Sequence, residues 1–504
     1  MSNLDLVELK LIELDGFTLD RHKVESVVYG KGRVAIPEEN LLRVRASRNR
    51  VEKQINDGKV VYGVNTGFGK LSDIEIAKDD IAKLQLNLLR ADAVGVGEPL
   101  PVPVVRAMMT LRANSLAKGF SGIREETLQL LVDMINEGVH PVVPCKGSVG
   151  ASGDLAPLSH IAIVLVGEGK AEYKGEILPG GEALKKAGLK PVALEAKEGL
   201  ALINGTQAMS GVGVLALNEA ERVGMAADMA ACLTMEALNG VISAFDSELL
   251  AVRPHPELEF VASRMRKWLE GSRRITRQGE IRIQDAYSIR CIPQVHGASW
   301  QAFNYVEERL KVEMNSATDN PIVLESGEIV SGGHFHGQPI ALSMDFLKVA
   351  AAEWANISER RTERLVNPQL SGLSPFLATD PGLECGLMVA QYAAASLVSE
   401  NKVLAHPASV DSIPTSANQE DHVSMGTIAS RQAREIIHNS ARVIAVEMIC
   451  ASQAIYLEGA EKELAPATRG YLEKIRDICP PLESDRAISE QMEELAQFIL
   501  REGV

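Results

Sequence analysis

The chain has 504 residues, with 52 Lys and Arg against 67 Asp and Glu, which gives a formal net charge of −15. Hydrophobic residues make up 46% and charged residues 24% of the chain, which is typical of a soluble globular protein and excludes disorder as its main character. Nucleic-acid and anionic-membrane binding both need clustered Lys and Arg, whereas the basic runs here do not exceed pairs such as Arg273-Arg274. The composition therefore argues against nucleic-acid and membrane partners.

The cysteine pattern and the apolar stretches indicate the compartment. Six cysteines are scattered without a CxxC pair, which is typical of reduced thiols. The N-terminal stretch MSNLDLVELKLIELDG has neither a basic nor an apolar signal-peptide region. The longest apolar stretches, 202–217 and 441–457, are interrupted by polar residues and predict buried helices rather than membrane spans. We expect a cytoplasmic protein.

The N-terminal part of the chain mixes short strand-like runs with helices. Residues 9–14 and 24–29 predict short strands. Apolar residues spaced by three and four predict helices over 38–56, 103–118 and 124–137, each of which closes near a glycine.

Beyond residue 140 the periodicity first stops and then returns in much longer segments. Residues 140–160 are rich in Gly, Pro and Ser and have no period, and 171–178 predict a strand-like insert. Long helices are predicted near 205–244, 297–315, 339–365, 383–401 and 425–459. Several of them are apolar nearly all round, which is typical of helices buried in a bundle or in an oligomer interface.

These elements predict a mainly α fold, with a long-helix bundle core and a smaller mixed α/β N-terminal region. We expect a mixed region over 1–200, a central bundle over 201–460 and peripheral C-terminal helices over 461–504. Polar residues concentrate in the joints between the long helices, where sites in bundles usually form.

The Gly-rich stretch 147–154, GSVGASGD, is the least ordinary segment of the chain. It suits a structural turn, whereas a P-loop would need Gly-Lys-Ser or Gly-Lys-Thr, which is missing here. Its chemical interpretation rests on Ala151-Ser152-Gly153, because an unobstructed Gly nitrogen can attack the carbonyl carbon of Ala151. Loss of that carbonyl oxygen and of the Ser152 hydroxyl as water would leave 4-methylidene-imidazole-5-one (MIO), an electrophile, with Asp154 next in sequence to assist proton transfer.

The longer stretch GSVGASGDLAPLSH resembles the prosthetic-group signature of the aromatic amino acid ammonia-lyases and aminomutases, and within them the histidine-directed lyases. The resemblance runs through several motifs between about residues 60 and 460. It implies an amino acid substrate, MIO formed from Ala151, Ser152 and Gly153 as the cofactor, no metal or nucleotide, and a homotetramer whose active sites are shared between chains.

Two motifs of the resemblance supply catalytic groups. Tyr62, in YGVNTGFG, is by chemistry alone a packed aromatic, but the family uses this Tyr, in a mobile loop, to remove the β-proton of the substrate. Such a base needs a pKa below the usual value of about 10, and we expect the loop to lower it. Asn204, in INGT, would otherwise be a helix cap, and the resemblance implies that it points at the MIO group and the substrate.

The stretch QDAYSIRC contains the residues expected to bind the amino acid end of the substrate. A lone Arg in a loop is usually a surface ion-pair partner, but the resemblance implies that Arg290 binds the substrate carboxylate, which its planar fork matches. Gln284 and Tyr287 resemble the residues that line the MIO group and hold the amino acid end.

The remaining motifs concern the substrate side chain. Phe335, in GGHFHG, is expected to form an apolar wall, although His334 stands where the family usually has Asn. Glu420, in TSANQEDHVS, matches the Glu that faces the imidazole ring in histidine-directed members, and a carboxylate would be costly beside a plain phenyl ring.

Asp92 departs from the family pattern. Histidine-directed members usually carry Ser-His where this chain has Ala91-Asp92, at the position that contacts the distal end of the side chain. Asp92 could still accept from an imidazole nitrogen, with its charge balanced by Arg90 or by a protonated ring, or it could mark a different substrate. Two carboxylates around one side chain favour a cationic or doubly donating group.

The sequence thus predicts an ammonia-lyase that converts L-histidine to urocanate and ammonia. A 2,3-aminomutase, a lyase for another aromatic or cationic amino acid, and an unmodified helical scaffold stay open as alternatives. A metal site is not expected, because the HxH of His334 and His336 is a weak signal without HExxH.

Overall fold

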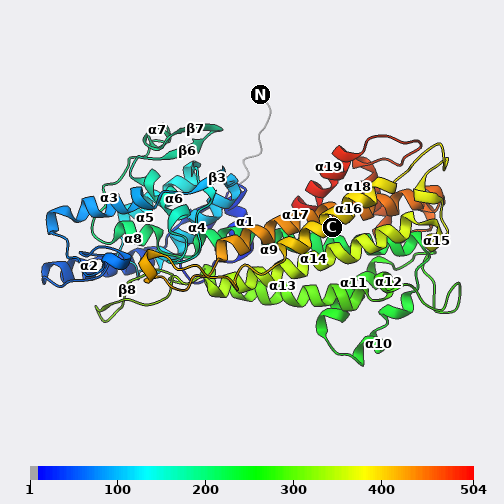
Figure 1. Ribbon diagram of the computed structural model, residues 1–504, viewed down its shortest axis with the longest axis horizontal. Coiled ribbons are helices and arrows are strands. Elements are labelled where there is room, and N and C mark those ends of the chain that lie inside the picture. Colours follow the sequence, from blue (N-terminus) through cyan, green and yellow to red (C-terminus); the bar gives the residue numbers. More distant parts are fainter. Residues whose placement is uncertain (1–8) are drawn as a thin grey trace. The chain divides into compact units, whose positions relative to one another are not determined.

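The computed structural model describes residues 9–504, so part of the N-terminal stretch without signal-peptide features lies outside the described residues. The chain divides into two compact units (Figure 1). Unit 1 comprises 1–215, 307–344 and 407–431, of which 1–8 are not described, and unit 2 comprises 216–306, 345–406 and 432–504. The predicted division along the chain at 200 and 460 stays a prediction.

The N-terminal part of unit 1 is a strand–helix–strand unit. Strand β1 (Lys10–Glu13) pairs in parallel with β2 (Gly32–Ala35), and helix α1 (Arg21–Val28) joins them. The predicted strand over 24–29 is therefore wrong, because its valines lie at helical spacing and bury one face of α1. The Asp20 side chain accepts from the backbone N–H of Lys23 at 2.8 Å and caps this helix.

Seven further helices belong to unit 1. They are α2 (Glu38–Asn56), α3 (Ile81–Asp92), α4 (Val102–Ala117), α5 (Glu125–Glu137), α6 (Leu155–Leu165), α7 (Gly180–Lys186) and α8 (Glu198–Ile203), with the 3-10 turns η1 (Gly69–Leu71), η2 (Lys78–Asp80) and η5 (Ser416–Asn418). The predictions for α2, α4 and α5 are confirmed to within a residue. Helices α3, α6 and α8 pack on one another, which brings three separate stretches of sequence together.

Small sheets connect the helices of unit 1. Strand β3 (Val96–Pro99) pairs antiparallel with β5 (Pro144–Lys146), and β8 (Ile322–Val323) pairs with β9 (Ile329–Val330). Strands β4 (Val139–Pro141), β6 (Lys170–Tyr173) and β7 (Glu176–Pro179) form an antiparallel sheet in which β6 and β7 are the predicted insert. The β3–β5 pair places the chain after α3 beside the Gly-rich stretch that follows β5.

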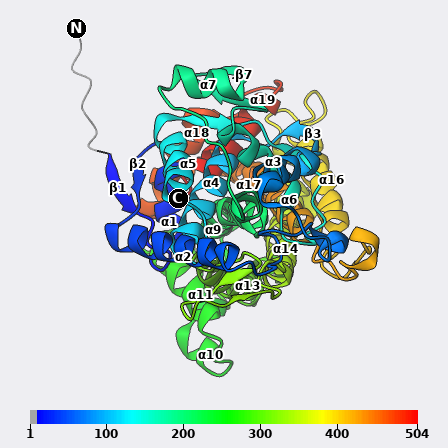
Figure 2. The same ribbon diagram turned by 90° about the vertical axis from the view of Figure 1, so that its left-hand side faces the viewer.

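Long helices form most of the rest of the chain, as predicted (Figures 1 and 2). They are α9 (Gln207–Ala237), α13 (Ile292–Met314), α14 (Gln338–Val366), α16 (Met388–Leu404) and α17 (Gly426–Leu457). The shorter elements are η3 (Ile242–Phe245), α10 (Ser247–Ala251), α11 (Pro256–Trp268), α12 (Tyr287–Arg290), α15 (Pro368–Ser371), η4 (Pro375–Leu377), η6 (Glu461–Glu463), α18 (Pro466–Ile478) and α19 (Ser489–Arg501). The mainly α fold is confirmed.

Within unit 2 the long helices are joined by buried hydroxyl groups. Ser299 on α13 donates to the backbone oxygen of Ala350 on α14 at 3.0 Å, and Ser440 on α17 donates to that of Ala351 at 3.0 Å. By length and composition α17 could cross a membrane, but 83% of its most apolar window is buried inside the protein, as in the core helix of a globular fold.

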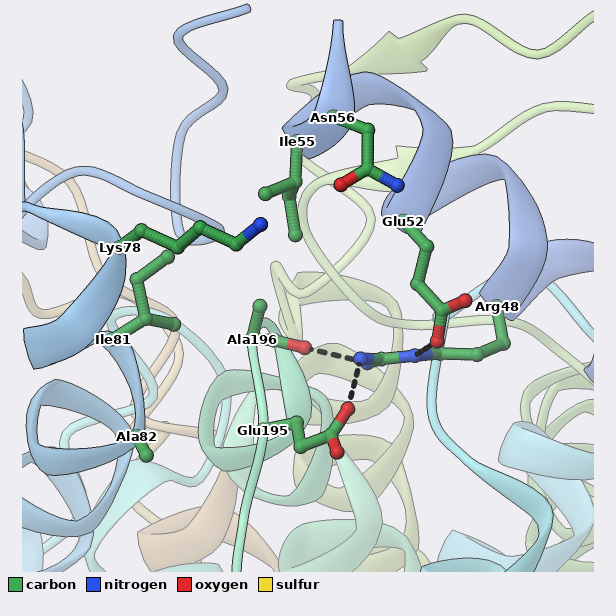
Figure 3. A pocket seen from close by; sticks show the side chains of 9 residues that line it. All are labelled: Arg48, Glu52, Ile55, Asn56, Lys78, Ile81, Ala82, Glu195 and Ala196. Atoms are coloured by element: carbon green, nitrogen blue, oxygen red, sulfur yellow. Dashed lines mark hydrogen bonds and ion pairs between the residues drawn. The ribbon is translucent and has the colours of Figure 1, made fainter. Parts of the chain in front are cut away.

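Unit 1 has its own apolar core beside a surface cavity. The core gathers Val51, Val64, Ile81, Ala196 and Val323. The cavity, of about 350 Å³, lies between the end of α2 and the start of α3 (Figure 3). Arg48 donates there to Glu52, Glu195 and the Ala196 oxygen at 2.8, 2.6 and 2.8 Å. Since two carboxylates balance this guanidinium and the lining contains no predicted site residue, we interpret the contacts as structural.

Candidate active site

The Gly-rich stretch 147–154 connects β5 to α6 and approaches another backbone segment very closely. Gly153 has a φ of +69°, and a Cβ on it would lie 2.2 Å from the backbone oxygen of Gly205. The backbone N–H of Asp154 donates to that same oxygen at 2.7 Å. Only glycine fits at position 153, so the nitrogen that would close the ring has no side chain beside it.

Asp154 fixes this stretch to the start of α9. Its Oδ2 accepts from the backbone N–H groups of Ala208 and Met209 at 3.0 and 2.8 Å, and its Oδ1 accepts from the hydroxyls of Ser148, at 3.0 Å, and Thr427. Complete burial raises the pKa of Asp154, and these hydrogen bonds oppose the rise. The carboxylate is therefore a structural anchor beside the tripeptide.

The segment before α17 holds the other side of the stretch. The backbone N–H of Met425 donates to the oxygen of Val149 at 2.9 Å, and the Ser424 hydroxyl donates to that of Gly150 at 3.1 Å. The tripeptide Ala151-Ser152-Gly153 is thus held between two polar contacts that are remote in sequence.

Asn204 lies next to the tripeptide, directly after the last residue of α8. Its side-chain Nδ2 donates to the backbone oxygen of Ser152 at 3.5 Å, and only 4% of the residue is exposed. Its Oδ1 is buried and has no hydrogen-bond partner among the described residues. A buried amide oxygen without a partner is costly, so this atom is suited to accept from a ligand.

A cavity of about 190 Å³ brings the tripeptide together with two predicted substrate-binding residues, Asp92 and Glu420. The Ser152 hydroxyl donates to Glu420 Oε1 at 3.0 Å, and the Thr415 hydroxyl donates to Glu420 Oε2 at 2.8 Å. Glu420 therefore faces the residue that would become the electrophile, and its contact with a substrate ring stays a prediction. None of the described residues that line this cavity is Lys, Arg or His.

Asp92 is the last residue of α3 and enters the same cavity. Burial and the nearby Glu420 charge raise its pKa to about 6. Arg90, one of the two groups considered as its counter-charge, instead donates through Nε and Nη2 to Glu168 at 3.0 and 2.5 Å. In this structure Arg90 is thus paired with another carboxylate.

Tyr62 lies in the turn before η1 and is held by its own loop. Its Oη accepts from the backbone N–H of Gly69 at 3.2 Å. Burial raises the pKa of Tyr62, the Gly69 hydrogen bond lowers it, and the Glu420 charge raises it again, so the net shift is upward. The expectation that the loop lowers this pKa is wrong, because desolvation and a like charge outweigh one hydrogen bond.

Phe335 is half-buried in the segment before α14. The neighbouring Gly337 lies so close to Met209 that a Cβ would meet its sulfur at 2.3 Å, which fixes this segment on α9. His334 is exposed, and His336 stacks on His422 with ring centroids 5.4 Å apart. The described residues contain no group of three or more His, Cys, Asp or Glu arranged to hold a metal ion.

The remaining predicted residues form a separate cluster in unit 2. Arg290 donates to Gln284 Oε1 at 2.7 Å, and its guanidinium carbon lies 4.6 Å from the centroid of the Tyr287 ring. Tyr287 is 72% exposed, and Arg290 Nε is buried without a hydrogen-bond partner among the described residues. The structure brings these three residues together and leaves a guanidinium group with donors to spare.

Several polar groups of the site were missed by sequence reasoning. Thr415 and Thr427 contact the carboxylates described above, and His160 accepts from the backbone N–H of Gly95 at 3.0 Å, which holds the chain that follows Asp92. Burial lowers the pKa of His160, which favours the neutral ring that this contact requires. Thr415 opens the motif TSANQEDHVS and His160 closes the motif GSVGASGDLAPLSH, so their place in these motifs could have identified them.

Comparison with known proteins gives a consistent result. The family model described as "Aromatic amino acid lyase" matches residues 19–477. The histidine ammonia-lyase of Bacillus subtilis (strain 168) is 54% identical over 495 residues, which cover 98% of this chain and 97% of that protein.

Solved structures resemble the chain over almost its whole length. Histidine ammonia-lyase from Trypanosoma cruzi is 41% identical with a TM-score of 0.90, over 97% of this chain and 93% of that one. Tyrosine aminomutase from Streptomyces globisporus is 37% identical with a TM-score of 0.94, over 97% of both chains.

Proposed function

The chain belongs to the aromatic amino acid lyase family, and from that premise we propose that it eliminates ammonia from L-histidine to give urocanate. The observation that carries the proposal is the cavity in which Glu420 accepts from the Ser152 hydroxyl at 3.0 Å. It joins the residue expected to become the electrophile to a carboxylate that suits a ring N–H donor.

The residues around the tripeptide fit the formation of MIO. Gly153 has room for no side chain, and Asn204 donates to the Ser152 oxygen, which is the carbonyl oxygen that the closed ring would retain. When formed, the group supplies an electron-poor alkene carbon that accepts the substrate amine and makes its nitrogen a better leaving group. Asn204 would hold the Ser152 oxygen of that group and would stabilise negative charge there, in the manner of an oxyanion donor.

Tyr62 is the proposed base for the β-proton. Its oxygen is held by the Gly69 N–H, a contact that also stabilises the phenolate. Because burial and Glu420 raise its pKa, the phenolate is the minor form at neutral pH, and turnover should increase as the pH rises.

Arg290 is the proposed anchor for the substrate carboxylate. The guanidinium group keeps donors free after its bond to Gln284, and a planar fork binds carboxylates bidentately. Tyr287 and Gln284 would orient the amino acid end. We propose that the chain acts as a homotetramer in the cytoplasm and that this cluster completes a site on another copy, which accounts for the 72% exposure of Tyr287.

The substrate ring would lie against Phe335 and face Glu420. The Thr415 hydroxyl holds Glu420 Oε2, which leaves Oε1 directed at the tripeptide. A carboxylate held in this way accepts from an imidazole N–H and disfavours an unsubstituted phenyl ring, because the ring would desolvate the charge without compensation.

Two measurements test the proposal. The purified chain is incubated with a panel of amino acids, and conjugated product is followed by absorbance; L-histidine should give urocanate with the highest kcat/KM. Intact mass should be lower than the sequence mass by two waters. An unshifted mass in active protein would refute the proposed electrophile and would leave the unmodified scaffold as the better description.

A second candidate is a 2,3-aminomutase with the same electrophile. It is favoured by the high TM-score of 0.94 to a tyrosine aminomutase, although that protein is only 37% identical. Product analysis separates the two, because a mutase returns ammonia to the β-carbon and yields a β-amino acid.

A further inference from the structure

We propose that Asp92 and Glu420, the carboxylate pair, bind the substrate side chain as a cation with two N–H donors, which for histidine is the imidazolium form. The inference rests on the proposed function and makes Asp92 a specificity-determining residue of this chain. It concerns the protonation state of the ligand, which the proposed function leaves open.

The first observation is that both carboxylates line one cavity with the tripeptide. Asp92 enters from the end of α3, and Glu420 enters from the loop before α17, so the two groups come from elements far apart in sequence. The β3–β5 pair and the contact of Gly95 with His160 hold the chain directly after Asp92. The pair is thus part of a built cavity.

The second observation is that, within the described part of a single chain, no cationic side chain lines the cavity beside the pair. None of the described residues lining the cavity is Lys, Arg or His. Arg90 is bound through two nitrogens to Glu168, and His160 uses Nε2 to accept from Gly95. Tyr62, which is also close enough to Glu420 for its pKa to be raised by that charge, adds no positive charge.

The third observation concerns which oxygens are free. In the uncyclised chain the Ser152 hydroxyl occupies Glu420 Oε1, and the Thr415 hydroxyl occupies Oε2. Formation of the electrophile removes the Ser152 hydroxyl as water, so Oε1 becomes available in the mature protein while Thr415 still orients the carboxylate. One oxygen of Glu420 and the carboxylate of Asp92 then face the ligand.

Two like charges in a partly dry cavity repel, and they disfavour ionisation of each other unless a cation joins them. The pKa of Asp92, raised to about 6 by burial and by Glu420, has the direction expected of an uncompensated pair. An imidazolium ring reduces the imbalance from two negative charges to one, and its two N–H groups can donate to both carboxylates. The positive ring also withdraws electrons from the β-carbon and assists removal of its proton.

The test compares Asp92→Asn with wild type on two substrates. One is L-histidine, and the other is thienylalanine, whose five-membered ring has neither charge nor N–H. Loss of a charge-assisted hydrogen bond should raise KM for histidine about 10- to 100-fold and leave KM for thienylalanine unchanged or lower. Glu98→Gln, which neutralises an exposed carboxylate on β3, is the matched control and should behave as wild type.

A binding experiment gives a second measurement that does not depend on turnover. Ser152→Ala cannot form the electrophile, so L-histidine binding to it is measured by calorimetry at pH 8 in buffers of different ionisation enthalpy. Free imidazole has a pKa of about 6.5 and is neutral there. Binding as imidazolium should take up close to one proton per site, and Asp92→Asn in the same background should abolish the uptake.

Each outcome decides between the inference and the proposed function. Equal KM values for histidine in wild type and Asp92→Asn, or histidine binding without proton uptake, would overturn the inference while histidine turnover still supports the function. If wild type ignores histidine but turns over another cationic amino acid in an Asp92-dependent manner, the function fails and the inference stands. A KM for thienylalanine that rises in Asp92→Asn as much as the KM for histidine would overturn the inference.

Discussion

Two groups of charges, one fully buried in unit 2 and one partly buried in unit 1, are built in opposite ways. In unit 2, Arg361 and Glu447 are fully buried and form a bidentate pair at 2.6 and 2.8 Å. The hydroxyls of Thr234 and Ser358 donate to the same carboxylate at 2.7 and 2.6 Å. Each of the two charges is met by the opposite charge, and the carboxylate also accepts from the two hydroxyls.

Among the residues of unit 1 that the structure describes, the active-site carboxylates are met by hydroxyls, by backbone N–H groups and by each other. Glu420 accepts from two hydroxyls, and its neighbour Asp92 has a pKa raised to about 6. A buried charge that is fully paired stabilises one arrangement of helices. A carboxylate without a counter-charge lowers the stability of the fold and is suited to bind a cationic ligand. The paired charges of unit 2 thus stabilise the fold, whereas the carboxylates of unit 1 belong to the active site. Variants of either group test this distinction.

The largest effect is expected at Ser152. Ser152→Ala cannot form the electrophile, so turnover of L-histidine should fall to background, while the thermal midpoint should stay within a few degrees of wild type. Intact mass is the direct check, since the variant should have the mass of its own sequence, whereas the wild type should be lighter than its sequence by two waters. Wild-type turnover in this variant would remove the tripeptide from the mechanism.

The next effect is expected at Tyr62. Tyr62→Phe keeps the ring and removes the proposed base, so kcat should fall by about 10²–10⁴-fold. In wild type, kcat should rise with pH, because the Tyr62 pKa is raised and more phenolate forms as protons are withdrawn. A kcat that is independent of pH in the alkaline range, together with an active Tyr62→Phe, would assign the base elsewhere.

The scaffold charges should affect stability rather than chemistry. Glu447→Gln leaves Arg361 buried without its counter-charge, which should cost about 3–5 kcal/mol of folding free energy per chain. Thermal unfolding at equal chain concentration measures the loss. Glu493→Gln is the matched control: it breaks a partly exposed pair with Arg442, which is worth about 0–1 kcal/mol. Equal effects of the two substitutions would contradict the distinction between paired scaffold and exposed charge.

The proposed substrate anchor should affect binding. Arg290→Lys keeps the charge but loses the planar fork, so KM for L-histidine should rise about 10- to 100-fold with a smaller change in kcat. Arg277→Lys is the control, because Arg277 is exposed on a loop of unit 2 and its substitution should leave KM unchanged. Unchanged affinity in Arg290→Lys would remove the anchor assignment.

A mixing experiment tests whether sites are shared between copies. Ser152→Ala and Arg290→Met chains are each expected to be inactive alone. If Arg290 serves the site of another copy, mixed oligomers refolded from both chains contain some sites with both native residues and regain part of the activity. Mixtures as inactive as their components would confine each site to one chain.

Much of the fold was predictable because it depends on local patterns. The boundaries of α2, α4 and α5 follow from apolar spacing and from glycines that cannot continue a helix. The same spacing rule failed at 24–29, because six residues are too few to distinguish the two-residue period of a strand from the 3.6-residue period of a helix. The three valines of this stretch suit a short strand, but in the structure they bury one face of α1, which begins after the capping residue Asp20.

The sequence named residues that the structure brings together, but it did not predict the electrostatics around them. Motifs identified Ser152 and Glu420, and the structure brings them to 3.0 Å across 268 positions of sequence. The shift of the Tyr62 pKa and the pairing of Arg90 with Glu168 depend on burial and on contacts between remote segments. Burial and remote contacts are known only once the chain is folded. The sequence therefore predicted a lowered Tyr62 pKa where the pKa is raised, and it considered Arg90, which pairs with Glu168, as a partner for Asp92.

The smallest effect is also the sharpest test of the contrast between the two units. An Asp whose pKa is raised to about 6 in the folded chain, against about 3.9 unfolded, binds more protons folded than unfolded between these values. Stability is therefore lost as the pH rises through this window, and the full penalty is present above pH 6. Asp92→Asn removes the penalty and should stabilise the chain by about 1–2 kcal/mol at pH 8, less than the full shift implies because the group is only partly buried.

At pH 4 the same substitution should change stability little, because the native carboxylate is then protonated in the folded chain. The measurement is the thermal midpoint of wild type and Asp92→Asn at both pH values, with Glu98→Gln as the exposed control. Neutralising Asp92 in unit 1 would thus stabilise the chain, whereas neutralising Glu447 in unit 2 would destabilise it. A loss of stability in Asp92→Asn at pH 8 would mean that Asp92 already has a counter-charge in the protein, and the cavity would then have no need of a cationic ligand.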